Sequence, residues 1–494
     1  MIADIQFNNT FSRLPETFYK KVKPTPVKSP SIIILNTRLC EELNLNPEKL
    51  FSKEGANILS GNFIPKGASP ISMAYGGHQF GNWVPQLGDG RAILLGEIDA
   101  KRNMKYDFQL KGSGITPYSR SGDGRSALGP VIREYLVSES MNYLNIPTTR
   151  SLSIVETGEH VMRDKILPGG ILARIAKSHI RVGTFQYFFS KNDLVSLKIL
   201  KDYTINRYFK EAMPSDKTSL NLLKLVSIKQ AKLIALWQSI GFIHGVMNTD
   251  NTSIIGDTID YGPCAFMDNY DPSTCFSSID QNKRYAYKNQ PKVAQWNLAM
   301  LANSILPLII EEVSSEEKAI KDAQNIIYDF ENIYKNYYYN IFRKKIGLSK
   351  KKEDDIVIID ELLEIMHNQK LDFTTTFRNL SLFLSNGEEI NKKIINHNYI
   401  KLGKWVLKWK KRLTFEDTNM KLIVESLNKN NPVLIPRNHI IENIIEEASF
   451  NKNYKPLKTY EKFINRPYDE RDMPIEFITP PQVINKNYKT FCGT

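Results

Sequence analysis

The chain has 494 residues, 41% of them hydrophobic and 24% charged, which are the proportions of an ordinary soluble globular protein. Its length allows two or three domains, and its four widely spaced cysteines indicate neither a disulfide framework nor a zinc site. No apolar run is long enough to cross a bilayer and no secretory or transit signal stands at the start, so we expect a cytoplasmic protein without a membrane partner.

The formal net charge is +13, from 66 basic and 53 acidic residues. Basic residues cluster in Arg343–Lys352 and Lys401–Arg412. Such clusters can bind nucleic acid or can be the solvated faces of helices. No DNA- or RNA-binding module accompanies them, so we expect solvated faces and no nucleic-acid partner.

Taken in chain order, the pattern predicts an α+β fold. An N-terminal arm (1–60) includes one helix, Ile34–Leu50. The following part (61–190) holds strands at Ala92–Leu95, Met104–Leu110, Leu152–Glu156 and Ile171–Ala176, with a helix at Ala127–Leu144. A third part (191–312) holds helices at Asp193–Tyr208, Leu220–His244 and Val293–Ile310. A helical C-terminal region (313–494) begins with Ser315–Ile346 and ends in a flexible tail, NYKTFCGT.

Two glycine-rich loops in the second part have a composition suited to phosphate. Gly88 and Gly90 precede Arg91, and Asp123-Gly124 closes the second loop. Glycine lets backbone N–H groups approach phosphate closely, and arginine presents a fork of donors to its oxygens. A glycine pair alone is a weak signal, because most such loops are only turns.

The strand Met104–Leu110 leads to Lys111, and the helix after it carries Glu134. In protein kinases a strand lysine that contacts the nucleotide phosphates is held by a helix glutamate. We therefore predict that Lys111 and Glu134 form an ion pair.

The stretch Met247–Gly262 predicts a metal site. Two short apolar runs, Ser253–Ile255 and Thr258–Ile259, flank Gly256-Asp257 and predict a hairpin. The hairpin would bring Asp260 back beside Asp250 and Asn251, and these oxygen ligands suit Mg²⁺.

The spacing from His244 resembles half of a kinase catalytic loop, in which a base Asp follows the His by two residues and a metal Asn by seven. The seventh residue here is Asn251, but the second is Val246. Asp260-Tyr261-Gly262 resembles the metal-binding D-F-G. The metal half of the apparatus is present and the usual base is missing.

Three long strings, AYGGHQFGNWVPQLGDGRA, QLKGSGITPYSRSGDGRSALGPVIREYL and HGVMNTDNTSIIGDTIDYGP, together resemble the selenoprotein O (YdiU-type) family. The likeness runs from about Phe7 to Pro291 and recurs at Cys492. It implies a protein-kinase-like two-lobed fold, once classed as a pseudokinase. It also implies a protein adenylyltransferase that binds ATP in the flipped orientation and moves AMP to Ser, Thr or Tyr hydroxyl groups of protein substrates.

The resemblance assigns a role to each matching position. Asn251 and Asp260 would hold Mg²⁺ or Mn²⁺, and Asp250 would accept the proton or act only as an outer metal ligand. Glu134 would orient Lys111. The residues implied to contact ATP are Gly88, Gly90, Arg91, Lys111, Asp123, Gly124, Arg174 and Arg181.

Other functions stay open at this point. UMP transfer from UTP is a variation that the sequence does not rank. An ordinary phosphotransferase is disfavoured by Val246, and a non-catalytic nucleotide-binding scaffold by Lys111, Asn251 and Asp260. We expect a monomer.

The resemblance also points to a redox switch. Cys492 stands where the family carries selenocysteine or cysteine, and Cys275 follows the metal stretch. A transient Cys275–Cys492 disulfide would clamp the tail over the catalytic part, with Cys264 as the rival partner.

Overall fold

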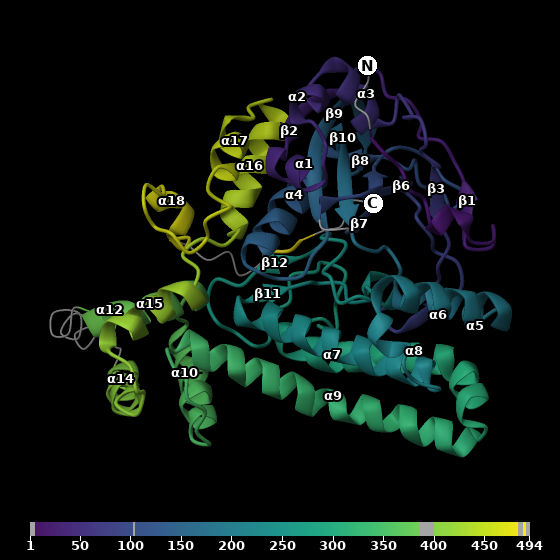
Figure 1. Cartoon of the computed structure of the whole chain (residues 1–494). Helices are drawn as coiled ribbons and strands as arrows, with labels where there is room; N and C mark the ends of the chain where they lie inside the picture. The colour runs from purple at the N-terminus through teal and green to yellow at the C-terminus, as the bar shows by residue number, and fades with distance from the viewer. Residues whose placement is uncertain (1–4, 102–103, 386–399, 483–487, 491–494) are drawn as a thin grey trace.

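The computed structural model describes residues 5–101, 104–385, 400–482 and 488–490. One antiparallel sheet dominates its N-terminal part (Figure 1). The strand order is β1 (Tyr19–Lys21), β3 (Ile71–Met73), β6 (Ala92–Asp99), β7 (Lys105–Lys111), β10 (Ile166–Ala176), β9 (Arg150–Met162) and β2 (Ser31–Leu35), with β8 (Ser126–Ala127) paired to β10. The mixture of helix and sheet confirms the α+β class.

Both faces of this sheet are covered. Successive side chains of a strand point to opposite faces, so neighbouring residues of β10 belong to different cores. On β10, Ile171 and Ala173 belong to the core beneath three short helices, α1 (Thr37–Glu42), α2 (Pro47–Leu50) and α3 (Lys53–Ser60). Leu172 belongs to the core on the other face, beneath α4 (Leu128–Tyr143). The helix that carries Glu134 therefore lies against the sheet that carries Lys111.

A helical layer follows the sheet in the chain. It consists of α5 (Val182–Phe189), α6 (Leu194–Tyr208), α7 (Thr218–Ser239), α8 (Gln290–Val313) and α9 (Glu316–Lys345), which share one apolar core. By length and composition α8 with its preceding turn could cross a membrane, but 56% of its most apolar window is buried in the protein. Burial of that kind is expected of a core helix.

The C-terminal region divides into two groups of helices. A second core is formed by α10 (Asp355–Gln369), α11 (Phe373–Arg378), α12 (Leu380–Ser385), α14 (Ile400–Leu413) and α15 (Met420–Asn430) together with the end of α9. The chain then returns to the sheet, where α16 (Asn438–Phe450) and α17 (Lys455–Glu461) pack beside α4, and ends its helices with α18 (Ile475–Ile478) (Figure 1).

Two predicted helices differ from the observed ones. Ile34–Leu50 is not one helix, because Ser31–Leu35 pairs with β9 and the side chains of Asn36 and Asn46 cap two separate short helices. The helix predicted to reach His244 ends at Ser239. Gly241 there has a φ of 71°, and Phe242–Ile243 (β11) pairs with Ala265–Phe266 (β12) instead.

The predicted hairpin around Gly256-Asp257 is wrong. The chain does turn there, since the Gly256 N–H bonds to the Ser253 carbonyl at 3.2 Å, but the flanking segments do not pair with each other. Ser253 pairs with Arg181, whereas Thr258 pairs with Thr148. Distant segments supply the hydrogen bonds that a hairpin would have supplied, and they hold the same loop in place.

Three residues of the predicted tail, 488–490, lie in the described part of the chain. Thr490 pairs in parallel with Ser277, and its hydroxyl donates to the Pro263 carbonyl at 2.6 Å. Residues Tyr488–Thr490 are therefore docked beside the segment that follows the metal stretch.

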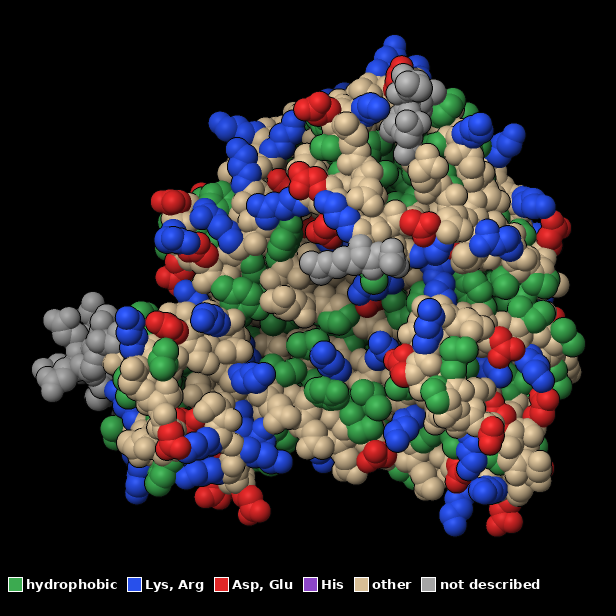
Figure 2. Space-filling model, in the orientation of Figure 1, with side chains coloured by type: hydrophobic (Ala, Val, Ile, Leu, Met, Phe, Trp, Pro, Cys, Tyr) green, Lys and Arg blue, Asp and Glu red, His purple; other side chains and the backbone are tan. Residues whose placement is uncertain are grey.

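The charged side chains on the surface are of mixed sign. On the visible face Lys and Arg side chains are interspersed with Asp and Glu side chains (Figure 2). Many of the basic groups have acidic neighbours, as Lys408 has Glu361 at 2.7 Å.

Candidate active site

A cavity of about 400 Å³ lies between the sheet and the segment after β11. Every residue that the sequence assigned to ATP, metal or proton transfer lines it, except Glu134. These lining residues come from two parts of the chain, the sheet and the segments after it. The sheet side contributes Gly88, Gly90, Arg91, Lys111, Asp123, Gly124 and Arg174; the helical side contributes Arg181, Asp250, Asn251 and Asp260.

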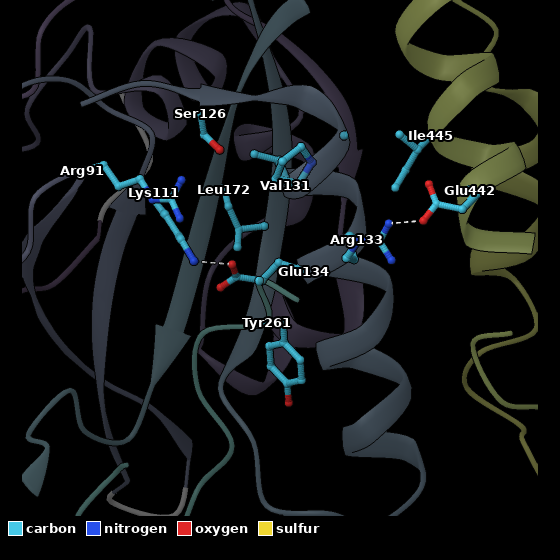
Figure 3. Close-up of a pocket in the computed structure, with 13 residues that line it drawn as sticks. Arg91, Lys111, Ser126, Val131, Arg133, Glu134, Leu172, Tyr261, Glu442 and Ile445 are labelled. Atoms are coloured by element: carbon cyan, nitrogen blue, oxygen red, sulfur yellow. Dashed lines mark hydrogen bonds and ion pairs between the residues drawn. The ribbon is translucent and has the colours of Figure 1, made fainter. Parts of the chain in front are cut away.

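Lys111 stands at the end of β7 and lies beside Glu134 of α4, with its Nζ 2.5 Å from Glu134 Oε2 (Figure 3). The sequence predicted this pair. Arg174, opposite Gln109 of β7 in the sheet register, donates to the other Glu134 oxygen at 3.2 Å and to Gln109 Oε1. One carboxylate of α4 therefore orients two cations of the sheet.

Asp260 is the centre of a cationic cluster. Its Oδ1 lies 2.7 Å from Arg174 Nη1 and 3.3 Å from Lys111 Nζ, and its Oδ2 lies 3.0 Å from Arg181 Nη1. Burial alone would raise the pKa of Asp260, but these three cations hold that pKa well below its usual range. Asp260 also has a φ of 64°, a conformation that residues other than glycine rarely adopt and that is often found at functional sites.

Arg181 connects the cluster to the loop before it. Its backbone pairs with Ser253, and its Nη1 donates to the Asp250 carbonyl at 2.8 Å. Its guanidinium lies over the ring of Tyr75, 4.5 Å from the centroid. Arg181 is buried, and these contacts fix its charge in the cavity.

Asp250 lies in a one-turn 3-10 helix, Thr249–Asn251, and lines the same cavity. Its Oδ1 is buried without a hydrogen-bond partner, and its Oδ2 accepts from Gln79 Nε2 at 3.3 Å. Burial raises the pKa of Asp250 to about 6, against the opposing effect of Arg181. The Asp250 Oδ1 is therefore an acceptor without a donor, and it is packed beside Gly77.

The oxygen donors of this cavity fit a divalent cation. Asp250 has an unpartnered carboxylate oxygen, Asn251 uses its amide N–H₂ to bond the Val246 carbonyl at 3.1 Å, and Asp260 lines the same space. Carboxylate and amide oxygens are the ligands that Mg²⁺ and Mn²⁺ take. These donors are two carboxylates and one amide, and no group of three or more His, Cys, Asp or Glu side chains suited to a metal occurs in the described ranges, this cavity included.

The glycines of the first loop serve the packing around Tyr118. A Cβ on Gly88, whose φ is 72°, would lie 2.3 Å from the Tyr118 ring, and one on Gly90 would lie 2.8 Å from the Tyr118 carbonyl. Only glycine lets the two loops close on each other in this way. At the rim of the cavity Asp123 accepts two hydrogen bonds from Arg163, at 2.9 and 3.1 Å.

A smaller cavity of about 130 Å³ adjoins Lys111 on the α4 side (Figure 3). Arg133 of α4 forms an ion pair with Glu442 of α16, and both side chains bond to the Tyr488 hydroxyl. Tyr488 therefore contacts α4 at Arg133. The next residue of that helix, Glu134, is paired with Lys111.

Of the two cysteines of the proposed redox pair, Cys275 lies in the described part of the chain and Cys492 does not. Cys275 is buried, its Sγ lies 3.3 Å from Asp280 Oδ2, and burial with that carboxylate raises the pKa of its thiol to about 11. Lys489 donates to the Cys275 carbonyl at 3.2 Å. Cys492 lies outside the described residues, and its pairing stays a prediction.

Several cavity residues were missed from the sequence. Gln79 and Tyr75 hold Asp250 and Arg181, and Gly77 lies against Asp250: a Cβ there would be 2.9 Å from Asp250 Oδ1. They stand in the AYGGHQFG string, where Gly76-Gly77 was the one available signal. The remaining missed lining residues include Arg120, Arg163 and Asn248.

Comparison with known proteins accounts for the pattern. The family model for "Protein adenylyltransferase SelO" matches residues 1–465. Curated relatives named "Protein nucleotidyltransferase YdiU" include one from Bradyrhizobium sp. (strain BTAi1), 47% identical over 494 residues, and one from Anoxybacillus flavithermus, 47% identical over 497 residues, each covering 100% of both chains. A third, from Maridesulfovibrio salexigens, is 46% identical over 100% of this chain and 99% of its own. The chain belongs to the SelO family and is a nucleotidyltransferase enzyme.

Proposed function

We propose that this enzyme transfers AMP from ATP to the hydroxyl groups of Ser, Thr or Tyr in protein substrates, with release of pyrophosphate. The observation that carries the proposal is a single cavity in which three cations, Lys111, Arg174 and Arg181, gather around Asp260 and which the Asp250 carboxylate also lines. Buried cations stabilise the charge that develops on a leaving pyrophosphate. The Asp250 carboxylate would serve the acceptor.

In the proposed reaction the acceptor oxygen forms a bond to the α-phosphorus while the bond from that phosphorus to the β-phosphate oxygen breaks. Pyrophosphate leaves with the electron pair of the broken bond, toward the three cations. Asp250, which lines the cavity, accepts the hydroxyl proton. Bound through Asn251 and Asp260, Mg²⁺ or Mn²⁺ would supply further neutralisation of phosphate charge.

The flipped orientation of ATP is part of the proposal. The buried cationic cluster around Asp260 suits the β- and γ-phosphates, and an α-phosphate would then face Asp250. The proposal includes a kinase-like division of the chain, with 61–190 as the sheet lobe, 191–312 as the catalytic lobe, and the arm 1–60 and the region 313–494 as additions. Val246, at the position of the kinase base, is buried and cannot accept a proton.

The experiment that tests this function identifies the transferred group. The purified enzyme is incubated with Mg²⁺ or Mn²⁺, a heat-treated bacterial protein extract, and either ATP or UTP, and the modified peptides are analysed by mass spectrometry. AMP on Ser, Thr or Tyr is the expected product. UMP with UTP alone would revise the nucleotide, phosphate would support a phosphotransferase, and no modification would support a scaffold.

A further inference from the structure

A cavity of about 410 Å³ lies between α9, α10 and the segment after β12, separate from the nucleotide cavity. Four tyrosine rings form its wall: Tyr270, Tyr334, Tyr338 and Tyr339. The α9 rings touch in sequence, with centroids 5.6 Å apart for Tyr334 and Tyr338 and 5.2 Å apart for Tyr338 and Tyr339. The faces of such rings attract cations.

The opposite wall is acidic. On α10, Asp360, Leu363, Glu364 and His367 line the cavity at spacings of three and four residues, which place them on one helical face. Asp360 accepts from the Tyr339 hydroxyl at 3.2 Å, and Glu364 has no hydrogen-bond or ion-pair partner in the described part of the chain. Both side chains are exposed to solvent.

This acidic wall contrasts with the rest of the molecule, whose net charge is +13. Lys335, the lysine that lines the cavity, is already paired with Glu331 at 2.7 Å. Among the described residues none of the recorded cation–ring contacts involves the four tyrosines, although the chain makes such contacts elsewhere, as Lys191 does over Tyr187 at 3.8 Å. His367 also lines the pocket, with its ring 6.4 Å from that of Tyr270, but its nearest carboxylate is Asp271 at 3.9 Å. The rings with Asp360 and Glu364 therefore offer a further cation both faces and carboxylates.

We propose that the tyrosine pocket, defined as Tyr270, Tyr334, Tyr338 and Tyr339 with Asp360 and Glu364, docks an arginine side chain in a basic segment of the protein substrate. A planar guanidinium can stack on a tyrosine face while its N–H groups bond carboxylates, which an ammonium group matches less well. The volume lies within the range of roughly 300–1,000 Å³ that is typical of ligand pockets.

The position of the pocket suits substrate docking. The segment after β12 contributes Tyr270 to the tyrosine pocket and Ile279 to the nucleotide cavity. One continuous stretch of chain therefore borders both sites. The inference rests on the proposed function for its role, because the partner is the protein that receives AMP.

Binding is tested without nucleotide. Fluorescence anisotropy measures the binding of three labelled peptides. The first has three arginines spaced by glycine, and the other two have neutral citrulline or lysine in place of the arginines. Asp360→Asn/Glu364→Gln removes the acidic wall, and Glu316→Gln/Glu317→Gln, which removes two exposed carboxylates from the other end of α9, is the matched control. We expect the first double variant to bind the arginine peptide about tenfold or more weakly, and the control to bind as wild type does.

Equal binding of the arginine and citrulline peptides, or equal loss in both double variants, would overturn the docking site. So would self-association in sedimentation that the pocket substitutions abolish, because a second copy of the chain would then be the occupant.

A second readout separates this proposal from the proposed function. With an acceptor protein carrying a basic segment, the pocket variant should raise the KM for acceptor about tenfold and leave the KM for ATP unchanged. If the enzyme transfers AMP but binds the arginine and citrulline peptides equally, the docking site alone is overturned. Pocket-dependent peptide binding in an enzyme that transfers no AMP supports the pocket and contradicts the proposed function.

Discussion

Gly77 lies so close to Asp250 that a Cβ on the glycine would be 2.9 Å from both the Cβ and the Oδ1 of Asp250. The backbone of β4 (Gly77–Gln79) therefore forms one wall around the carboxylate, and Gln79 of the same strand donates to its Oδ2. The strand and the 3-10 helix with Asp250 are further joined by the His78 N–H, which donates to Thr249 Oγ1 at 2.7 Å.

The first prediction concerns this contact. Gly77→Ala should displace Asp250 and lower turnover by at least about tenfold, because proton transfer requires hydrogen-bond reach. Nucleotide affinity should change less than turnover, because Lys111 and Arg174 are held by Glu134 and Asp260 rather than by Asp250. Steady-state kinetics and the thermal unfolding midpoint separate this effect from unfolding. Wild-type turnover in a variant with unchanged stability would show that Asp250 does not need this wall.

The second prediction concerns Asp260. Asp260→Asn should abolish AMP transfer, because it removes a proposed metal ligand. It should also make the metal-free protein bind pyrophosphate more tightly, by about tenfold, because a negative charge no longer competes for Lys111, Arg174 and Arg181. Isothermal titration calorimetry in the presence of a chelator measures the affinity. Weaker pyrophosphate binding in the variant would mean that the carboxylate holds the cations in place rather than competing for them.

The third prediction is a dependence of stability on pH. Lys345 is buried against Phe377, with its Nζ 4.5 Å from the ring centroid, and burial lowers its pKa from 10.5 to about 7. Between pH 7 and 10.5 the unfolded chain therefore binds this proton more strongly, so the Lys345 contribution makes the folded state more stable as pH rises. The slope is on the order of 1.4 kcal/mol per pH unit.

Lys345→Met should remove this slope and raise the free energy of unfolding most at pH 7 and below. Urea denaturation at pH 7 and pH 9.5 measures it, with the exposed neighbour in Lys344→Met as the matched control. Parallel pH dependences of Lys345→Met and wild type would contradict the buried-ammonium interpretation.

The fourth prediction concerns the thiol pair. Mild oxidation should produce a Cys275–Cys492 cross-link in non-reducing peptide maps, and Cys492→Ala should remove the redox dependence of activity. Because burial raises the pKa of the Cys275 thiol to about 11, the cross-link should form faster as pH rises from 7 to 9. Finding Cys492 only as a free thiol under oxidising conditions would exclude the switch.

The sequence predicted those features that follow from local pattern or from residue order. The strand with Lys111 and the helix with Glu134 were readable from their periodicity, and their order indicated the ion pair. The order of Asn251 and Asp260 after His244 placed them in one site. Their local signals were sufficient because each lies at the end of a regular element or in a long specific string.

Contacts between distant segments were not readable in the same way. Ser253 and Thr258 have the composition of a hairpin, but they pair with Arg181 and Thr148, and only the folded chain shows those partners. Gly77 and Gln79 lie against Asp250 although they are far from it in the sequence. Gln79 and Asp250 are separated by 171 residues. The docking of Thr490 on Ser277 depends on backbone pairing, which a polar tail sequence does not indicate.

The position of the label in transferred phosphate tests the central claim most directly. The enzyme is incubated with an acceptor protein and ATP that carries radioactive phosphorus in either the α- or the γ-phosphate, with Asp250→Asn as the control. The flipped orientation predicts that α-label becomes protein-bound, that γ-label leaves as pyrophosphate, and that Asp250→Asn lowers α-label transfer by roughly two orders of magnitude or more. Protein-bound γ-label would contradict it and support an ordinary kinase reaction.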